Sequence, residues 1–214
     1  MLNIDWTVTG PFQENSYIIW KENKDSCIII DPGDDFVNVI KMINKNKVKP
    51  IAIINTHAHL DHIASVADLK ERYSIPFYLH YNEKEVLKNY QRDSLIFGLV
   101  PSKTPEVDFW FRSGILEIGP FNIELIETPG HTPGGTCLKF ENHLFTGDTI
   151  FSRSIGRTDL PGGDWNILSD SLVRVMKKIP ENQILYPGHG PITSLKIEMQ
   201  ENQFLIPLLD KVNS

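Results

Sequence analysis

The sequence predicts an α/β protein in which two mixed β-sheets are flanked by helices. Near the N-terminus two strands rich in Ile and Tyr follow one another, Asn15–Lys21 and Ser26–Asp31, and the second ends in turn chemistry. Ile51–Asn55 is a short continuous apolar run between helical patterns, which indicates a strand buried on both faces. Strands that pair locally in some places and alternate with helices in others favour two mixed sheets, with a single doubly wound parallel sheet as the alternative.

The other elements follow from spacing and capping. Val37, Ile40 and Ile43 recur at near-helical spacing, and Asp164 is placed to cap the helix that starts at Trp165. The expected helices are Asp35–Asn46, Ala64–Tyr73, Asn82–Tyr90, Trp165–Lys178 and Ser194–Gln203. The further strands are expected at Phe77–His80, Ile115–Ile118, Phe121–Glu127, Thr136–Phe140, His143–Thr146 and Gln183–Tyr186. A loop is expected after the third of these helices.

The composition fits one globular domain over residues 1–214. Hydrophobic residues make up 41% and charged residues 22% of the chain, so a sizeable core can form without disulfides or structural metals. The 21 basic and 27 acidic residues give a net charge of −6, which argues against general nucleic-acid binding and against an anionic membrane surface. No repeat, low-complexity segment or long linker divides the chain.

The cysteines and the N-terminus indicate a cytoplasmic protein. Cys27 and Cys137 are too few for a disulfide framework and are expected to be packed, reduced thiols. The first ten residues, MLNIDWTVTG, have neither the basic nor the apolar region of a signal peptide. The strongest apolar clusters, Ile28–Ile30 and Ile51–Ile54, are far shorter than the roughly 20 residues that a membrane-spanning helix needs.

The most informative segment is THAHLDH, which begins at Thr56. It places His57, His59, Asp61 and His62 within six residues, a pattern that chance would produce in about 5 of 10,000 chains of this composition. In extended chain, His57 and His59 project to the same side and can share one ion. A turn after them would direct Asp61 and His62 elsewhere, which suits a second ion nearby.

Three later turns supply further ligand types. His131 lies in the Pro- and Gly-rich segment PGHTPGG, Asp148 follows an apolar strand in TGDT, and His189 follows another in PGHG. Ligands in sheet proteins often gather at the carboxyl ends of strands. Each of these residues alone would usually be a capping or turn residue, but beside THAHLDH they indicate metal binding. His80 and His143 lack such surroundings and are expected to be structural.

The segments THAHLDH, PGHTPGG, TGDT and PGHG resemble, in this order, the motifs of the metallo-β-lactamase superfamily. The resemblance runs from about residue 10 to the end of the chain, and it is closest to the glyoxalase II branch in its short single-domain form. It implies a four-layered αβ/βα sandwich with a two-metal site along one edge of the sheets.

The resemblance also implies two divalent metal ions, with zinc expected first and iron or manganese as alternatives. By motif the first ion would be held by His57, His59 and His131, the second by Asp61, His62 and His189, and the two would be bridged by Asp148. Zinc β-lactamases with a cysteine in the second site carry that cysteine at the position of Asp148. The aspartate therefore weakens a β-lactamase interpretation.

The chemistry expected of such a site is thioester hydrolysis. Two ions about 3.5–4 Å apart can share a water and lower its pKa toward about 7, and the resulting hydroxide would attack a carbonyl carbon. Asp61 is the expected catalytic residue, because its carboxylate could orient the hydroxide. A thiol of pKa about 8.5 leaves as thiolate without a dedicated acid. The resemblance implies S-lactoylglutathione, a small molecule, as substrate.

Two departures concern the thiol carrier. Two-domain glyoxalase II enzymes grip glutathione with a C-terminal helical domain, which is not expected here because about 25 residues follow His189. Arg157 matches a position near the glutathione glycine carboxylate in those enzymes. It is either an anion contact or the partner of Asp159 or Asp164 in a salt bridge. The oligomeric state stays open.

Three other functions compete. A mono-iron persulfide dioxygenase of the same superfamily is the main alternative, because Gly156–Asp164 (GRTDLPGGD) is similar to that group. Such enzymes leave the second metal site vacant, whereas Asp61, His62 and His189 are all present here. A nuclease is disfavoured by the acidic charge balance. A non-catalytic metal-binding module is disfavoured by the complete set of ligand candidates.

Overall fold

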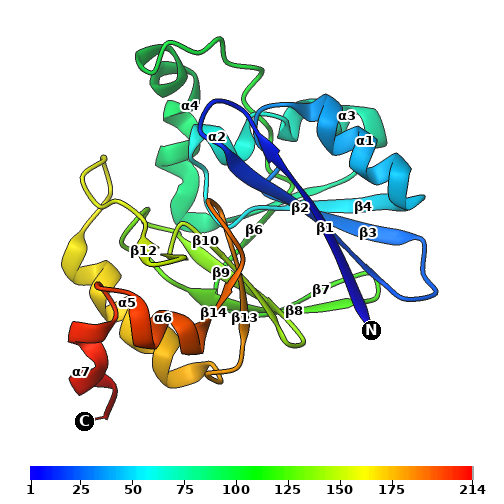
Figure 1. Cartoon of the computed structure of the whole chain (residues 1–214). Helices are drawn as coiled ribbons and strands as arrows, with labels where there is room; N and C mark the ends of the chain where they lie inside the picture. Colours follow the sequence, from blue (N-terminus) through cyan, green and yellow to red (C-terminus); the bar gives the residue numbers. More distant parts are fainter. Residues whose placement is uncertain (214) are drawn as a thin grey trace. The chain divides into compact units, whose positions relative to one another are not determined.

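The computed structural model describes residues 1–213 and divides them into two compact units. The first unit consists of Met1–Phe111 and Ile118–Pro120, and the second of Arg112–Glu117 and the chain from Phe121 onward. Each unit is built around one six-stranded mixed sheet (Figure 1). The prediction of two mixed sheets flanked by helices is confirmed. The alternative of one doubly wound parallel sheet is wrong, because the strands form separate sheets with antiparallel pairs in both.

The sheet of the first unit follows chain order, β1-β2-β3-β4-β5-β6. Its strands are β1 (Leu2–Thr9), β2 (Glu14–Lys21), β3 (Ser26–Ile30), β4 (Lys49–Ile54), β5 (Phe77–His80) and β6 (Phe109–Phe111). The first three strands pair antiparallel, whereas β3 to β6 are parallel neighbours. The carboxyl ends of β3, β4 and β5 therefore lie along the same edge of the sheet.

Helices cover this sheet through an apolar core. They are α1 (Phe36–Asn46), α2 (Leu60–Ile63), α3 (Val66–Tyr73), the 3-10 turn η1 (Tyr81–Glu83) and α4 (Lys84–Ile96). Val39 of α1, Leu69 of α3 and Leu87 of α4 belong to one buried cluster with Ile29 and Ile53 of the sheet. Burying such aliphatic side chains supplies roughly 1.5–3 kcal/mol each, so the core fixes the strand ends that carry the candidate ligands.

The sheet of the second unit has the order β14-β13-β10-β9-β8-β7. Its strands are β7 (Gly114–Ile118), β8 (Phe121–Glu127), β9 (Thr136–Phe140), β10 (His143–Gly147), β13 (Ile184–Pro187) and β14 (Thr193–Ser194). A small hairpin, β11 (Ile150–Phe151) with β12 (Ser154–Ile155), stands apart as a two-stranded sheet. Strands β10 and β13 are parallel, so the turns that follow them emerge at one edge.

The second unit has its own helical layer. Its helices are α5 (Trp165–Lys178), α6 (Leu195–Glu201), the 3-10 turn η2 (Ile206–Leu208) and α7 (Leu209–Asn213). Asp164 caps α5 as predicted, because its carboxylate accepts the backbone N–H groups of Asn166 and Ile167. Leu172 of α5 and Leu195 of α6 pack in the cluster that buries the sheet. Within residues 1–213, no helix is both long enough and apolar enough to cross a membrane.

Most predicted elements are present, and the differences have local causes. Leu2–Thr9 is a strand that the prediction lacked, and its two buried ends flank half-exposed positions. The helix expected at Asn82–Tyr90 starts as a 3-10 turn and continues to Ile96, beyond the point where the apolar spacing fades. The helix expected from Ala64 begins at Val66, because Leu60–Ile63 forms a separate turn.

Candidate metal centre

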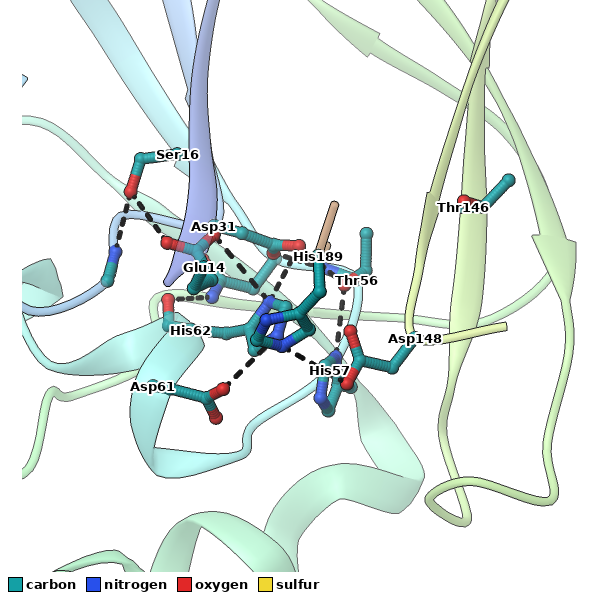
Figure 2. A network of polar contacts seen from close by, with 12 residues as sticks. Glu14, Ser16, Asp31, Thr56, His57, Asp61, His62, Thr146, Asp148 and His189 are labelled. Carbon is teal, nitrogen blue, oxygen red and sulfur yellow. Dashed lines mark hydrogen bonds and ion pairs between the residues drawn. The ribbon is translucent and has the colours of Figure 1, made fainter. Parts of the chain in front are cut away.

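In the first unit, the candidate ligands leave the sheet at one edge. Asp31 directly follows β3, and the chain that leaves β4 passes through His57 and His59 before α2 begins. Asp61 and His62 lie in the first turn of α2. Because β3 and β4 are parallel neighbours, segments that are distant in sequence meet where both strands end, and Figure 2 shows Asp31 beside His62.

Asp31 organises this edge through both carboxylate oxygens. The backbone N–H of Thr56 donates to Oδ1 at 2.7 Å, and the Thr56 hydroxyl donates to Oδ2 at 2.6 Å. His62 Nδ1 lies 3.1 Å from the same Oδ2. All three residues are buried. A carboxylate at Nδ1 holds the proton there and leaves the Nε2 lone pair for a metal, which is how metal-binding histidines are commonly supported.

His57 has its ring nitrogens assigned by the same network. Its Nδ1 lies 3.1 Å from the Thr56 hydroxyl oxygen, and that hydroxyl already donates its proton to Asp31. The hydroxyl must therefore accept from His57 Nδ1–H. The Nε2 of His57 then carries a lone pair, as a metal ligand requires. The imidazoles of His57 and His62 therefore both carry their proton on Nδ1, and the Asp31 carboxylate is responsible for both.

The imidazoles of this edge pack closely together. The ring centroid of His57 is 4.9 Å from that of His59 and 4.1 Å from that of His62. Buried Glu83 supports the connecting loop, because its Oε2 accepts the backbone N–H of Ala58 at 2.8 Å. The Glu83 carboxylate therefore fixes the backbone of the loop between β4 and α2.

A second buried carboxylate lies beneath His62. Glu14 Oε2 accepts hydrogen bonds from the hydroxyls of Thr9 at 2.7 Å and Ser16 at 2.9 Å, and Oε1 is 3.9 Å from His62 Nδ1. Burial raises the pKa of Glu14 well above its usual range, and the nearby Asp31 carboxylate raises it further. Figure 2 shows Glu14 and Ser16 above His62 and Asp61 below it.

Gly33 lets the backbone segments of this edge approach one another. A Cβ built on Gly33 would lie 2.3 Å from the backbone oxygen of Asp61 and 2.4 Å from side-chain oxygens of Glu14 and Thr9. The Ser16 hydroxyl meanwhile accepts the Gly33 N–H at 2.9 Å. Only glycine fits this position, and the turn after β3 can then press against the first turn of α2.

Asp61 is more accessible than the buried carboxylates Glu14, Asp31 and Glu83. Its side chain is 17% exposed, and its Oδ2 lies 3.9 Å from His62 Nε2. The carboxylate therefore faces the ring nitrogen that the Asp31 contact leaves for a metal. This arrangement suits a carboxylate that both binds an ion and contacts a reacting molecule.

In the second unit, a backbone carbonyl fixes His131. The residue lies in the turn after β8, and its Nδ1 is 2.7 Å from the carbonyl oxygen of Arg157. A carbonyl can only accept, so Nδ1 carries the proton and Nε2 carries a lone pair. That Nε2 lies 3.4 Å from Asp148 Oδ2. With its proton on the other nitrogen, a neutral His131 cannot donate a hydrogen bond to Asp148.

Asp148 Oδ2 is faced by a second imidazole. His189 follows β13 just as Asp148 follows β10, and its Nε2 lies 3.5 Å from the same oxygen. The parallel pairing of the two strands explains this meeting, and the Gly188 N–H donates to the Gly147 carbonyl at 2.9 Å to tie the turns together. Figure 2 shows both Asp148 and His189.

Gly156 allows the close approach that places His131. A Cβ at this position would lie 1.9 Å from the backbone oxygen of Asp148 and 3.0 Å from His131 Nδ1. The next residue, Arg157, supplies the carbonyl that His131 needs. Any side chain at position 156 would therefore displace the segment that sets the His131 tautomer.

The donor sets of both units fit divalent metal ions. In the first unit, the Nδ1 contacts of His57 and His62 place both protons on Nδ1, so that each Nε2 carries the lone pair of a metal ligand, and Asp61 Oδ2 lies 3.9 Å from His62 Nε2. In the second, the lone pair of His131 faces a carboxylate oxygen, a repulsive arrangement that a shared cation relieves. Imidazole nitrogen and carboxylate oxygen suit zinc, iron and manganese alike.

Arg157 forms a salt bridge with Asp159, which is one of the two roles predicted for it. Its guanidinium binds Asp159 with two hydrogen bonds of 2.7 Å each. This contact holds the pKa of the Asp159 carboxyl at about 2. The anion contact stays a prediction, and the structural role of Arg157 is exerted through its backbone carbonyl.

The remaining histidines and the cysteines have structural surroundings. His80 Nδ1 accepts the backbone N–H of Asn82, and His143 Nδ1 lies 3.0 Å from the Tyr186 hydroxyl. Cys27 and Cys137 are buried free thiols, as predicted. Burial raises the pKa of Cys27 to about 12 and that of Cys137 to about 11, so neither is a ready nucleophile or ligand.

Sequence reasoning missed the residues that support the ligands. Asp31 was interpreted only as part of a turn, and Glu14, Thr56 and Glu83 were not singled out. Asp31 and Glu14 carry a weak signal, since each is an acidic residue beside a strongly apolar strand. Such a residue is costly to bury unless it has a polar partner.

Comparison with known proteins identifies the family. The model of the "Metallo-beta-lactamase superfamily" matches residues 9–189. "Probable metallo-hydrolase YqgX" of Bacillus subtilis is 36% identical over 200 residues, covering 92% of this chain and 94% of that protein. "Hydroxyacylglutathione hydrolase GloC" of Haemophilus influenzae is 32% identical over 210 residues, covering 95% and 98%.

Solved structures give the same result. The BLEG-1 B3 metallo-beta-lactamase has a TM-score of 0.89 and 36% identity, covering 95% of this chain and 99% of that chain. A protein solved in a di-iron-bound form has a TM-score of 0.86 and 33% identity, covering 94% and 100%. These similarities, together with the His and Asp ligand sets at the strand ends, show that the chain belongs to the metallo-beta-lactamase superfamily, whose fold and metal-dependent hydrolase character it shares.

Proposed function

We propose that this protein is a glyoxalase II-type hydrolase of glutathione thioesters, such as S-lactoylglutathione, that works with two divalent metal ions. The observation that carries the proposal is Asp148, whose Oδ2 is faced by the Nε2 atoms of His131 and His189 at 3.4 and 3.5 Å. An aspartate in this environment suits a bridging ligand. The similarity to a hydroxyacylglutathione hydrolase over nearly the whole chain supports the substrate class.

The proposed ligands are the seven residues predicted from the motifs. One ion would be held by His57, His59 and His131, the other by Asp61, His62 and His189, with Asp148 bridging. Bound ions would activate water and polarise the substrate carbonyl. We propose zinc for both positions. Iron is the alternative metal, because the chain is similar to a protein solved in a di-iron-bound form.

The chain's own residues would orient the reacting groups. Asp61 would accept a hydrogen bond from the attacking water and hold it toward the carbonyl carbon. Asp31 and Thr56 would keep the protons of His62 and His57 on Nδ1 throughout, so that neither ring turns. A thiolate leaves readily, because a thiol pKa is about 8.5, and no general acid is required.

The test is hydrolysis of S-lactoylglutathione by zinc-loaded protein. Asp61→Asn should lower kcat/KM by at least about 100-fold, because a single positioned acid–base group is worth about 100- to 10,000-fold. His57→Ala, which removes a proposed metal ligand, should also lower kcat/KM strongly. Asp25→Asn, a change in an exposed carboxylate that pairs with Lys49, is the matched control. Full activity in either site variant would refute the proposed roles.

Metal content separates this proposal from the main alternative. Elemental analysis of protein purified without added metal should find about two ions per chain. One tightly held iron, with no second ion after metal is supplied, would favour a persulfide dioxygenase. Oxygen uptake with glutathione persulfide on the same sample would then be the deciding assay.

A further inference from the structure

A cavity of about 210 Å³ lies within the first unit, beside Asp61. Its wall is formed by the turn between β1 and β2, the start of α1, helix α2 and the segment in and after α4. Asp61, the proposed catalytic residue, is one of the lining residues. The cavity therefore adjoins the residue that is proposed to orient the attacking water.

The lining hydroxyl groups in and after α4, those of Tyr90, Ser94 and Ser102, all donate hydrogen bonds within the protein. The Ser102 hydroxyl donates to the carbonyl of Ala64 at 2.6 Å, so it accepts the proton of the Tyr90 hydroxyl at 3.1 Å. The Tyr90 oxygen also accepts the N–H of Ser102 at 3.2 Å. Ser94 donates to the Tyr90 carbonyl at 2.8 Å. None of these three hydroxyl protons is directed to a ligand.

The two other lining hydroxyls are engaged as well. Thr9 donates to Glu14 at 2.7 Å, and Ser65 donates to the Gly33 carbonyl. All hydroxyl protons of the lining therefore have partners inside the protein. A ligand with many acceptor atoms would find few donors here, and burying such acceptors without hydrogen bonds is costly.

The charges of the lining are negative. Asp34, Asp35, Asp61 and Asp68 all line the cavity, and among the residues the structure describes no Lys, Arg or His does. Asp35 is occupied as the cap of α1, because its carboxylate accepts from the N–H of Asn38. The charge of Asp61 would be offset by the proposed metal ions, but an anionic group in this cavity would still meet Asp34, Asp35 and Asp68 with no lining cation.

The remaining lining is apolar. Leu60, Leu99 and Val100 contribute aliphatic surface, and Phe12 contributes an aromatic ring from the turn between β1 and β2. Phe12 packs edge to face on Phe97 with ring centroids 5.8 Å apart, which joins this turn to the end of α4. Val100 is 95% exposed, so the apolar surface extends from the cavity to its rim.

We propose that this cavity binds the acyl group of the thioester, and that it favours uncharged apolar acyl groups of about six carbons over anionic ones and over small ones, the lactoyl group included. The inference rests on the proposed thioester hydrolysis and refines it. An engineered apolar cavity of about 150 Å³ holds a benzene ring, so 210 Å³ accommodates a hexanoyl or benzoyl group. Each methylene moved from water into such a site strengthens binding severalfold.

The first test compares thioesters of one carrier. With zinc-loaded protein, kcat/KM for S-hexanoyl- and S-benzoylglutathione should exceed that for S-acetylglutathione at least tenfold. S-succinylglutathione, which adds a carboxylate, should be no better than the acetyl compound. Equal rates for all four would overturn the acyl-pocket inference and leave thioester hydrolysis intact.

Variants then locate the preference. Val100→Asp adds a charge at the rim and should lower the hexanoyl-to-acetyl ratio at least fivefold. Asp68→Asn removes a charge from the lining and should raise the succinyl-to-acetyl ratio. Ile115→Asp is the matched control, because Ile115 is 74% exposed and lies in β7, outside the cavity lining. Unchanged ratios in both cavity variants would contradict the proposal.

Ligand binding gives a readout that needs no turnover. Benzyl alcohol added to zinc-loaded protein should shift the methyl resonances of Leu99 and Val100, whereas benzoate, of the same shape but charged, should not. Equal shifts from both probes, or none from benzyl alcohol, would refute the cavity's selectivity. If benzyl alcohol binds but no thioester is hydrolysed, the proposed function fails and the cavity stands.

Discussion

The two units position their candidate ligands by different means. In the first, buried side chains do so: Asp31 and Thr56 fix the imidazoles of His57 and His62. In the second, the backbone does so, because the carbonyl of Arg157 fixes His131. Side-chain support can be removed by replacing one residue, whereas backbone support is lost only when the path of the chain changes.

The comparison therefore predicts two kinds of sensitivity. In the first unit, substitution of a residue that touches no metal should weaken metal binding directly. In the second, the sensitive positions should be glycines that let backbone segments meet.

Replacing Asp31 by Asn should have the largest effect. The amide keeps the shape but loses the charge that holds protons on His62 Nδ1 and, through Thr56, on His57 Nδ1. Removal of a carboxylate that supports a metal-binding histidine typically costs about 10- to 100-fold in metal affinity. Competition with a zinc chelator measures the change, and Asp25→Asn is the surface control. Unaltered affinity would refute side-chain control in the first unit.

Gly156→Ala should destabilise the second unit. The added methyl would overlap the Asp148 carbonyl at 1.9 Å, and forced overpacking typically costs about 1–3 kcal/mol. Thermal unfolding should show a Tm lowered by roughly 2–4 °C for each kcal/mol. Gly114→Ala is the control, because no atom lies within 4 Å of its Cβ and only backbone strain is added. Equal shifts in both variants would contradict the argument from contact.

Arg157→Ala should leave zinc affinity within about twofold of the parent value, because the backbone carbonyl that binds His131 remains. The same change should raise the pKa of Asp159 from about 2, since the Arg157 hydrogen bonds are the main cause of its lowering. A nuclear magnetic resonance titration of the Asp159 carboxyl measures this shift. A large loss of zinc would instead assign the support of His131 to the side chain.

The two thiols should show the smallest response. With pKa values of about 12 and 11, Cys27 and Cys137 hold almost no thiolate at pH 8, whereas an unfolded cysteine has a pKa of about 8.5. A disulfide reagent such as Ellman's should therefore react with neither thiol in the native protein and with both in denaturant. Rapid native labelling of one thiol would show that its unit opens locally.

Local patterns were sufficient to predict most of the fold. Trp165–Lys178 was predicted with its cap, because capping and apolar spacing are both local signals. Leu2–Thr9 has a strand signal that the prediction does not use, because Leu2, Ile4 and Trp6 alternate with polar residues. The two-residue strands β11, β12 and β14 are too short to have any periodicity.

The candidate ligands were easier to find than the groups that support them. Four of the ligand candidates lie within one short motif, from His57 to His62, so their spacing is visible in the sequence. Asp31 meets His62 only because β3 and β4 are parallel neighbours, a fact of tertiary structure. The cavity beside Asp61 likewise combines segments from Thr9 to Ser102, which no local pattern connects.

The sequential strand order of the first sheet has a consequence for synthesis of the chain. Because β1 to β6 are neighbours in chain order, the first sheet needs no strand beyond Phe111. Domains generally fold as units, with the N-terminal part first, while translation proceeds at roughly 5–20 residues per second. We expect His57, His59, Asp61 and His62 to be in place on a folded nascent chain before His131, Asp148 and His189 leave the ribosome. A metal ion would then first meet four of the seven proposed ligands.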